Sequence, residues 1–326
     1  MRASSGSDRM PIRRAALICR FSCLLGCAIA SLPSVPVPSP DFPSLAAAID
    51  AMRETPDTIL VLEDGQHDVG ATPLLLRHPL HLRAKRRSYA QEQGWATRLR
   101  GSLDMDGAVS GTFKGLSIEN QRSREMPDAS VCVMEVIGGR WDMTLCQIAG
   151  AGTGCKHGAL VELGGEPAAS TSDLPHSFRS CNSPTLTLRQ CCVRSLRPDE
   201  IEVDVEKQEV EHLIFAGGNS TLIMEDTLVH GGVWYALHMF DRACVRMLRC
   251  CITGADTAMA VEDIINLDMR SCLVRENNYV FHVYSPYPRF TSINNTFIGV
   301  LFEDMDRFTN ASMIEGETVD VHAVML

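Results

Sequence analysis

The stretch VRMLRCCI, residues 245–252, returns as LDMRSCLV at residues 267–274. Both follow the pattern apolar–x–Met–x–x–Cys–x–aliphatic. Further copies, some of them degraded, are GTFKGLSI (111–118), WDMTLCQI (141–148), LTLRQCCV (186–193), LIMEDTLV (222–229) and TSINNTFI (291–298). From the first copy to the last, the starting positions are separated by 30, 45, 36, 23, 22 and 24 residues. A constant core with variable spacers is typical of a stacked repeat architecture.

The alternation of apolar and polar residues inside each copy indicates a strand, because a helix would need a 3.6-residue spacing. Leucine-rich repeats share the period, but their leucine–asparagine spacing and helical return segment are absent from this sequence. Propeller blades need about 40 residues each. The remaining architecture is a parallel β-helix, in which coils of short strands stack at roughly 4.8 Å. We therefore predict an all-β fold, a parallel β-helix solenoid.

Stacking places equivalent residues of successive coils above one another, so each position of the repeat becomes a column. A core column of Met, Leu or Ile is expected at Met143, Leu188, Met224, Met247, Met269 and Ile293. A core column of Val or Ile is expected at Ile148, Val193, Val229, Ile252, Val274 and Ile298. A column of small residues, placed at an inward corner, contains Cys146, Cys191, Thr227, Cys250, Cys272 and Thr296.

The composition limits the class of protein. With 326 residues and 45% hydrophobic residues, the chain can bury a large core in one elongated domain. The net charge of −10 argues against a nucleic-acid partner. The sequence has no uncharged apolar run of about 18 residues, so a transmembrane span is not expected. We expect a monomer.

Thirteen cysteines raise the question of disulfides. Four of them occupy the small column, where a buried thiol behaves as a small apolar residue. The adjacent pairs Cys191–Cys192 and Cys250–Cys251 point to opposite faces of a strand, which does not suit a disulfide. Zinc-type Cys/His spacing is absent from the sequence. We expect reduced structural cysteines, with no metal and no other cofactor.

Residues 1–40 differ in kind from the rest. Arginines precede the apolar stretch FSCLLGCAIA (21–30), which ends in a small–x–small site, the order of a secretory signal. The early Ser/Arg richness also suits an organellar transit peptide. A third reading is a disordered extension followed by a proline-rich linker from Pro33 to Pro43. We favour a secreted or endomembrane location, and organellar and cytosolic locations stay open.

The segment after the linker resembles a known family. SLAAAIDA (44–51) predicts an amphipathic helix, and DTILVLEDG (57–65) predicts a strand and a turn. This order is similar to the N-terminal cap and first coil of pectate-lyase-like β-helix proteins. The coils that follow resemble the carbohydrate-binding/sugar-hydrolase repeats of certain F-box and SHC-binding proteins. The resemblance extends over roughly residues 43–307 and implies a right-handed coil with a helical cap, which would shield the open end of the stack.

These observations divide the chain into a leader at 1–40, a β-helix at 41–310 with a cap helix at about 43–54, and a tail at 311–326. Two long spacers contain a polar insertion at 165–184 and an acidic insertion at 197–212, and we expect them to leave the stack near the same corner. Inserted loops on a rigid scaffold often carry function. The basic segment 77–87 is interpreted as a solvated rim.

The best catalytic constellation comes from aligning YALHMFD (235–241), TAMAVED (257–263) and YVFHVYS (279–285). The alignment stacks Asp241 on Asp263, with Glu262 adjacent, and two carboxylates about 5 Å apart form an acid/base pair when one pKa is raised. The competing interpretation is that each aspartate terminates a strand at a turn. We favour the structural interpretation, because the column ends at Ser285.

In the turn columns, Arg189 is expected to stack on Glu225 and Asp226 on Arg249, and alternating charges of this kind are mildly stabilising. Two functions remain. The first is a non-enzymatic β-helix that binds a protein or polysaccharide partner through its long face and inserted loops. The alternative is a secreted polysaccharide lyase or glycoside hydrolase of pectinase type. Aromatic residues make up only 6% of the chain, which favours the first function.

Overall fold

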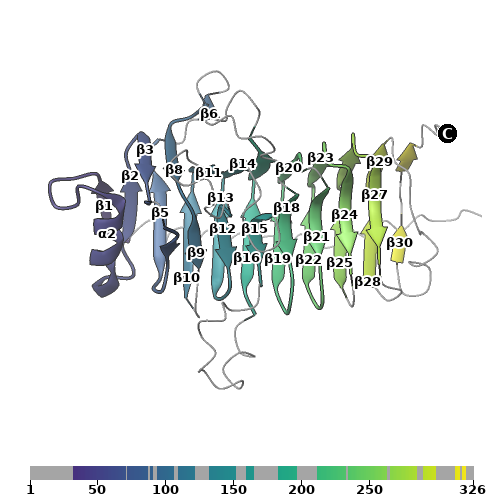
Figure 1. Cartoon of the computed structure of the whole chain (residues 1–326), viewed down its shortest axis with the longest axis horizontal. Helices are drawn as coiled ribbons and strands as arrows, with labels where there is room; N and C mark the ends of the chain where they lie inside the picture. The colour runs from purple at the N-terminus through teal and green to yellow at the C-terminus, as the bar shows by residue number, and fades with distance from the viewer. Residues whose placement is uncertain are drawn as a thin grey trace, which may run out of the picture.

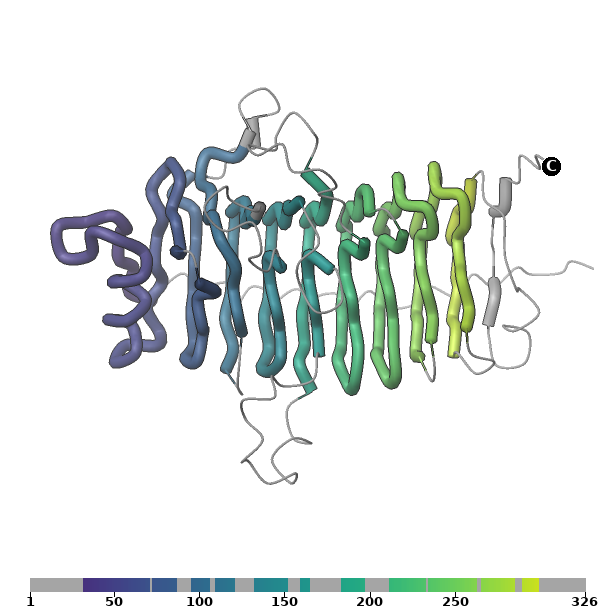
Figure 2. Tube along the Cα trace, in the orientation of Figure 1, coloured from purple at the N-terminus to yellow at the C-terminus, as the bar shows by residue number. Residues whose placement is uncertain are grey.

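The computed structural model describes residues 32–70, 72–86, 89–90, 94–105, 109–121, 132–151, 159–164, 183–196, 211–232, 234–262, 265–284, 289–298, 313–315 and 318–320. Within these residues the chain forms a parallel β-helix, as the repeats predict (Figure 1). Successive coils lie side by side along one long axis, which Figure 2 shows as a row of similar turns.

Three parallel sheets form the three sides of the coil, and each coil visits sheet A, then sheet B, then sheet C. Sheet A contains β1 (Ser34–Val37), β2 (Ile59–Leu62), β5 (Leu80–Ala84), β10 (Ser110–Lys114), β13 (Arg140–Thr144), β16 (Thr185–Arg189), β19 (Thr221–Glu225), β22 (Cys244–Leu248), β25 (Asn266–Arg270), β28 (Arg289–Ile293) and β30 (Met313–Glu315). Sheet B contains β3 (Gly65–Asp68), β8 (Thr97–Arg100), β11 (Ser117–Gln121), β14 (Gln147–Ala151), β17 (Cys192–Ser195), β20 (Leu228–His230), β23 (Cys251–Thr253), β26 (Leu273–Arg275), β29 (Thr296–Ile298) and β31 (Thr318–Asp320). Sheet C contains β4 (Leu74–Leu75), β9 (Leu103–Met105), β12 (Met134–Val136), β15 (Ala159–Leu163), β18 (His212–Ala216), β21 (Tyr235–Met239), β24 (Thr257–Val261) and β27 (Tyr279–Val283).

The cap helix α2 (Leu45–Ala51) continues into the 3₁₀ helix η1 (Met52–Glu54), which confirms the predicted helical cap. The Ser44 hydroxyl accepts a hydrogen bond from the Ala47 backbone N–H, a standard N-cap that satisfies one free donor of the first turn. Leu45, Ala48 and Ile49 are buried and join the core at this end of the stack. A small antiparallel hairpin, β6 (Tyr89–Ala90) and β7 (Gly94–Trp95), is inserted before β8.

The first strand begins earlier than the sequence indicated. Residues 34–37, inside the proline-rich segment interpreted as a linker, form β1 and pair in parallel with β2. The one proline of β1, Pro36, is tolerated because β1 is the edge strand of sheet A, where a missing N–H leaves no ladder bond unmade. Within the expected tail, β30 and β31 pair with β28 and β29.

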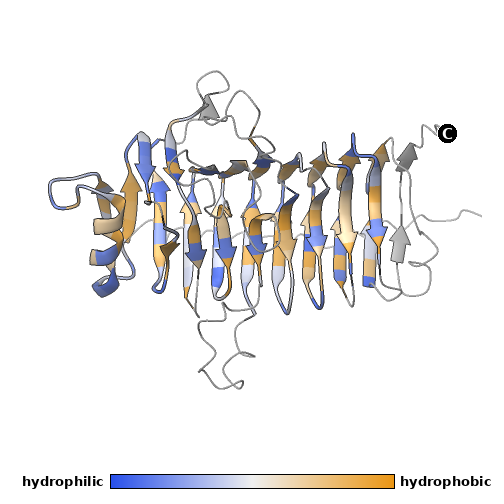
Figure 3. Cartoon of the chain, viewed as in Figure 1, coloured by the Kyte–Doolittle hydropathy of each residue, from blue (hydrophilic) through white to orange (hydrophobic). Residues whose placement is uncertain are grey.

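The predicted core columns are confirmed over most of the stack. Met143 pairs in register with Leu188, Leu188 with Met224, Met224 with Met247, and Met247 with Met269. The Val/Ile column is likewise in register from Ile148 to Val274. These side chains are 0–2% exposed and line the interior. Hydrophobic and hydrophilic residues alternate along many of the strands, as Figure 3 shows.

The last coil is shifted by one residue from the predicted alignment. Ser292, not Ile293, pairs with Met269, and Phe297, not Ile298, pairs with Val274. Ile293 and Ile298 are only half-buried. Thr296, predicted in the small column, instead pairs with Leu273 in sheet B. An alignment based only on apolar residues put this coil out of register, because Phe290 and Phe297 fill its interior in place of the two isoleucines.

From β13 to β26, each corner between sheets A and B is made by two residues. The first has a left-handed backbone, with φ of 55° at Leu145, 53° at Arg249 and 53° at Ser271. The second is the small-column residue, and its side chain donates a hydrogen bond to the carbonyl two residues earlier. These bonds run from Cys146, Cys191, Cys250 and Cys272 Sγ at 3.3–3.4 Å and from Thr227 Oγ1 at 3.0 Å. The small column therefore favours side chains that are both small and able to donate a hydrogen bond.

The cysteines of the small column are buried and free, in line with the sequence interpretation. Cys146 and Cys191 lie on adjacent coils, as do Cys250 and Cys272. The hydrogen bond with the Cys146 sulfur, together with burial, raises the pKa of the Cys191 thiol far above its usual value. Cys250 has the same relation to Cys272. Neutral buried thiols of this kind react slowly, because the thiolate is the nucleophile.

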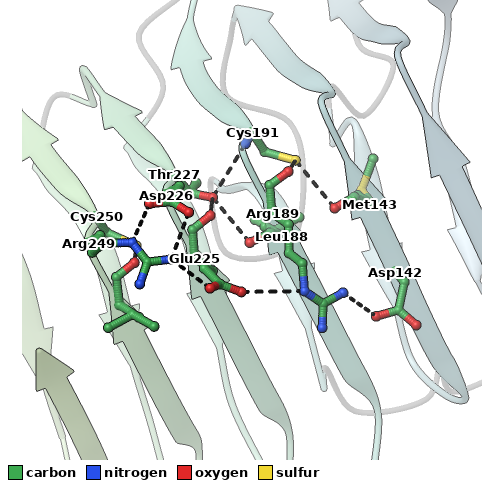
Figure 4. A network of polar contacts seen from close by, with 11 residues as sticks. Asp142, Met143, Leu188, Arg189, Cys191, Glu225, Asp226, Thr227, Arg249 and Cys250 are labelled. Carbon is green, nitrogen blue, oxygen red and sulfur yellow. Dashed lines mark hydrogen bonds and ion pairs between the residues drawn. The ribbon is translucent and has the colours of Figure 1, made fainter. Parts of the chain in front are cut away.

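Alternating charges bridge four coils on the outer face of sheet A (Figure 4). Arg189 contacts Asp142 at 3.3 Å and Glu225 at 3.6 Å, and Arg249 contacts Glu225 and Asp226, each at 2.6 Å. The hydrogen bond with the Arg249 guanidinium holds the pKa of the Asp226 carboxyl below its usual value. The predicted Arg189–Glu225 and Asp226–Arg249 pairs are both present. Because all five side chains are solvated, these ion pairs favour the in-register alignment of the coils more than they raise the free energy of unfolding.

The two insertions do not leave the stack at one corner, as the spacing had suggested. The 165–184 segment follows β15 of sheet C and precedes β16 of sheet A, whereas the 197–212 segment joins β17 of sheet B to β18 of sheet C. The first insertion therefore leaves from the C-terminal end of a sheet C strand, and the second leads into the N-terminal end of one. Residues 165–182 and 197–210 themselves lie outside the described residues. Within the part of the chain that is described, no helix is long and apolar enough to cross a membrane.

Candidate functional site

Of the three predicted carboxylates, Asp241 lies in the turn after β21, with a left-handed φ of 60°. Asp and Asn tolerate this conformation better than most residues, so the backbone alone accounts for an aspartate here. The strands are in the predicted register, with Met239 paired to Val261 and Val261 to Val283. Asp263 lies outside the described residues, so the stacking of Asp241 on Asp263 stays a prediction.

Glu262 is engaged by a histidine. It lies one residue past β24, and its Oε1 is 2.9 Å from Nε2 of His238 in β21. The side chains are 30% exposed for Glu262 and 14% exposed for His238. His238 and His282 occupy the same outward column, with Ala260 between them, as the alignment predicted.

The outer face of sheet C brings six polar and aromatic side chains together, which we call the C-face cluster: Tyr235, His238, Phe240, Glu262, His282 and Tyr284. They come from the ends and outward positions of β21, β24 and β27. The backbone ladder continues past these strands, because the N–H groups of Phe240, Glu262 and Tyr284 each bond to a carbonyl of the preceding coil at 2.9 Å. Phe240, Glu262 and Tyr284 thus form one outward column with a rise of roughly 4.8 Å per coil.

Tyr235 lies across the intermediate coil. Its hydroxyl is 2.5 Å from the Tyr284 hydroxyl and 3.5 Å from Nδ1 of His282, both two coils away. This reach is possible because the coil between presents only Thr257 and Ala260, which are 2% and 0% exposed beneath the cluster. Burial, followed by the hydrogen bond with Tyr284, raises the pKa of the Tyr235 hydroxyl well above its usual value. Tyr235 is therefore neutral at physiological pH and links its own coil to the coil of His282 and Tyr284.

Ring contacts fix the remaining members. The His282 and Tyr284 rings stack with centroids 4.1 Å apart, and the ring of Phe215 meets His238 edge-on at 5.1 Å. Phe240 is 41% exposed and Tyr284 47% exposed, so each offers a ring to solvent. The arrangement places Glu262 between residues with exposed rings, at positions that directly follow β24, β21 and β27.

Sheet C also differs in charge from the other two sheets. Asp104, Glu135 and Glu162 occupy successive positions of the column that continues through Phe215 to His238. The eight strands of sheet C contain no lysine or arginine. In contrast, the strands of sheets A and B contain Arg83, Lys114, Arg140, Arg189, Arg246, Arg270, Arg289, Arg98, Arg100, Arg194 and Arg275. The acidic column went unnoticed in the sequence because the alignment of the third strands covered only residues 235–241, 257–263 and 279–285 and did not extend to the earlier coils. Aligning the short third strands, LDM, MEV and ALVEL, would have revealed it.

Other charged features have structural partners. In the basic segment, Lys85 pairs with Glu63 at 2.7 Å and Arg86 with Asp64 at 3.3 Å, while Arg87 lies outside the described residues. Across the described ranges, no group of three or more His, Cys, Asp or Glu side chains has the arrangement of a metal site. The C-face cluster is the group of polar and aromatic side chains that we take as the candidate site.

Comparison with known proteins places the similarity at the level of fold. No family model and no curated protein sequence matches this chain. Among solved structures, pectate lyase Pel9A has a TM-score of 0.49 at 11% identity, over 87% of this chain and 74% of the lyase. The pectin methylesterase of Aspergillus niger has a TM-score of 0.43 at 10% identity, over 89% of this chain and 90% of the esterase. The three parallel sheets and the cap agree with the resemblance to pectate-lyase-like β-helices. Similarities at this level say nothing about the chemistry of this chain.

Proposed function

We propose that the protein binds a glycan through the C-face cluster and does not transform it. The observation that carries the proposal is the column of Phe240, Glu262 and Tyr284, in which residues with exposed rings lie one coil to either side of a glutamate. The apolar face of a sugar ring packs on an aromatic ring, while its hydroxyl groups donate to a carboxylate. A few oriented polar groups among aromatic side chains are typical of small-ligand sites.

Preorganisation supports binding on this surface. Tyr284 is held by the Tyr235 hydroxyl and by the His282 ring, and Glu262 is held by His238. Side chains that are fixed before the ligand arrives lose less rotamer entropy on binding, which is worth about 0.5–1.5 kcal/mol for each such side chain.

The absence of turnover is part of the proposal. Of the predicted acid/base set, Glu262 is hydrogen-bonded to His238. Asp241 sits where the backbone itself favours aspartate. The pectinase-type alternative would require Asp241 and Asp263 to act as a pair.

The test is binding to a panel of oligosaccharides by calorimetry, with Phe240→Ala and Tyr284→Ala as variants. Each should weaken binding at least tenfold. Leu228→Ala, which truncates a side chain 37% exposed on sheet B, should leave affinity unchanged. If no oligosaccharide binds, and a protein partner is instead lost in both aromatic variants, the ligand is a protein and the proposal is wrong.

A second assay separates binding from catalysis. Pectic, alginate and glucuronan polysaccharides are incubated with the wild type and scored for reducing ends and unsaturated products. We expect none above background. Turnover that disappears in Asp241→Asn or Asp263→Asn would overturn the non-catalytic proposal in favour of a lyase or hydrolase.

A further inference from the structure

Three Asn-x-Ser/Thr sequons, the acceptor motif for N-linked glycans, occur in the sequence at Asn219, Asn294 and Asn310. The motif alone is a weak signal, because an acceptor asparagine also has to lie on the surface. The structure describes the first two, whereas Asn310 lies outside the described residues. We infer that Asn219 and Asn294 are modification sites, and that each carries an N-linked glycan on the finished protein. This inference concerns two corners of the coil and does not rest on the C-face cluster.

Asn219 lies exposed in the turn between β18 and β19. Gly218, the residue before it, has a left-handed φ of 61°, so the backbone of this turn does not itself require an asparagine at the next position. Ser220, the residue after it, is 1% exposed. With respect to the described residues, the Asn219 amide makes no hydrogen bond. The fold therefore presents the Asn219 side chain to solvent without using it.

The second sequon contains two adjacent asparagines with opposite surroundings. Asn295 is 0% exposed, accepts a hydrogen bond from the Cys272 N–H at 2.7 Å and donates one to the Met269 carbonyl at 3.1 Å. Asn294 is exposed at the corner, and its amide has no hydrogen bond to any described residue. A left-handed φ of 55° suits asparagine, so the backbone by itself does not mark an acceptor. The exposed amide is what distinguishes Asn294 from its buried neighbour.

The hydroxyl residue of each sequon is also unused by the fold. In an earlier coil, the hydroxyl of Thr227 makes the corner by donating to the Glu225 carbonyl at 3.0 Å. In the last coil Asn295 fills the corner, and Thr296 lies one residue later, half-buried at the start of β29. Thr221 has the same place at the start of β19. Within the described ranges neither Thr296 nor Thr221 gives its hydroxyl to a hydrogen bond. The second half of each motif is therefore present without a structural task of its own.

The modification is a group transfer to the asparagine amide. Its nitrogen forms a bond to the anomeric carbon of a lipid-pyrophosphate-linked oligosaccharide, the bond from that carbon to the pyrophosphate oxygen breaks, the amide loses one proton, and the lipid pyrophosphate leaves. Asn219 precedes β19 and Asn294 follows β28, so both acceptors lie at strand ends of sheet A. An attached glycan would extend into solvent there without displacing a strand or a core side chain. The transfer requires entry into the secretory pathway, for which the leader at 1–40 was favoured from the sequence.

The experiment expresses the full chain, with its own N-terminus, in a eukaryotic cell line. Glycans are released by N-glycosidase in heavy-oxygen water, which converts each modified asparagine into a labelled aspartate that mass spectrometry locates. We expect label at Asn219 and Asn294, and each site should add one mobility step on a gel that the enzyme removes. Asn266, which is exposed on β25 but is not part of a sequon, is the matched control and should stay unlabelled.

Thr221→Ala and Thr296→Ala should each remove one label and one mobility step, while Thr221→Ser and Thr296→Ser should retain them. These variants keep both asparagines, so the left-handed corner at Asn294 is undisturbed. Unlabelled asparagine at both sites of the wild type would overturn the inference, and so would label that persists in the two alanine variants. Label at only one site would overturn it for the other. The binding of oligosaccharides to the C-face cluster is measured separately, so its failure leaves this inference standing.

Discussion

Replacing Ser271 by glycine should stabilise the protein. Ser271 forms the corner between β25 and β26 with a φ of 53°, and its side chain is exposed. A residue with a Cβ costs about 1–2 kcal/mol in the left-handed region. The larger conformational freedom of glycine in the unfolded chain opposes the gain by about 0.4–1 kcal/mol. The net increase in the free energy of unfolding should be about 0.5–1 kcal/mol.

The equivalent corner of an earlier coil supplies a control in which the expected change in stability has the opposite sign. Gly115 occupies the equivalent position between β10 and β11 with a φ of 73°, and an added Cβ would meet only the Ala84 Cβ, at an ordinary 3.5 Å. Gly115→Ala therefore tests the backbone conformation without a steric clash. We expect it to lower the free energy of unfolding by about 1 kcal/mol.

The assay is thermal unfolding followed by circular dichroism. Ser271→Gly should raise the midpoint by about 1–3 °C, and Gly115→Ala should lower it by a similar amount. Gln190→Gly, at a corner with a φ of 54°, should add to Ser271→Gly, because the two sites share no contacts. A fall in the midpoint for Ser271→Gly, together with full tolerance of Gly115→Ala, would show that these corners carry no backbone strain and would refute the reasoning.

Three further outcomes follow from buried side chains. Met247→Asp should abolish cooperative unfolding, because it buries a carboxylate without a partner, whereas Met247→Leu should leave the melting curve close to that of the wild type. Asn295→Asp should cost about 1–3 kcal/mol, since the Asn295 amide donates to the Met269 carbonyl, while Asn294→Asp at the exposed turn should be nearly neutral in the same denaturation assay. Cys250 should resist iodoacetamide in the native state and react only after unfolding, as read by mass spectrometry, because burial and the Cys272 sulfur raise its thiol pKa.

The sequence was informative where the geometry is strict. From β10 to β29 a coil passes from sheet A to sheet B in two residues, the first of them left-handed, so the spacing from the Met column to the Val column is constant there. The β6–β7 hairpin lengthens this spacing between β5 and β8. The constant spacing made the repeat visible, and it placed Met224, Met247 and Met269 correctly. The alignment failed in the last coil, because the rule of an apolar residue in each column does not distinguish Ile293 from Ser292 when Phe290 fills the space.

The C-face cluster could be predicted only in part. The alignment of the third strands put His238 and His282 in one column, and the structure agrees. The crossing of two coils by Tyr235 was not predictable, because it depends on the small side chains of the coil between. The low aromatic content argued against sugar-stacking surfaces, but a fraction of the whole chain does not show where the rings gather. Phe240 and Tyr284 lie on the same face.

The three sides of the coil are under different constraints. From β10 to β29, sheets A and B are joined by two-residue corners and hold the arginine–carboxylate ion pairs, so changes there would disturb the register of the stack, whereas the β6–β7 hairpin lies in the connection from β5 to β8. The connections into and out of sheet C carry both long insertions, which shows that the coil tolerates variation at these two edges. Sheet C can therefore change its outward residues at little cost to folding. An acidic, aromatic surface without strand lysine or arginine has accumulated on that side, where the scaffold leaves most freedom for a ligand to be accommodated.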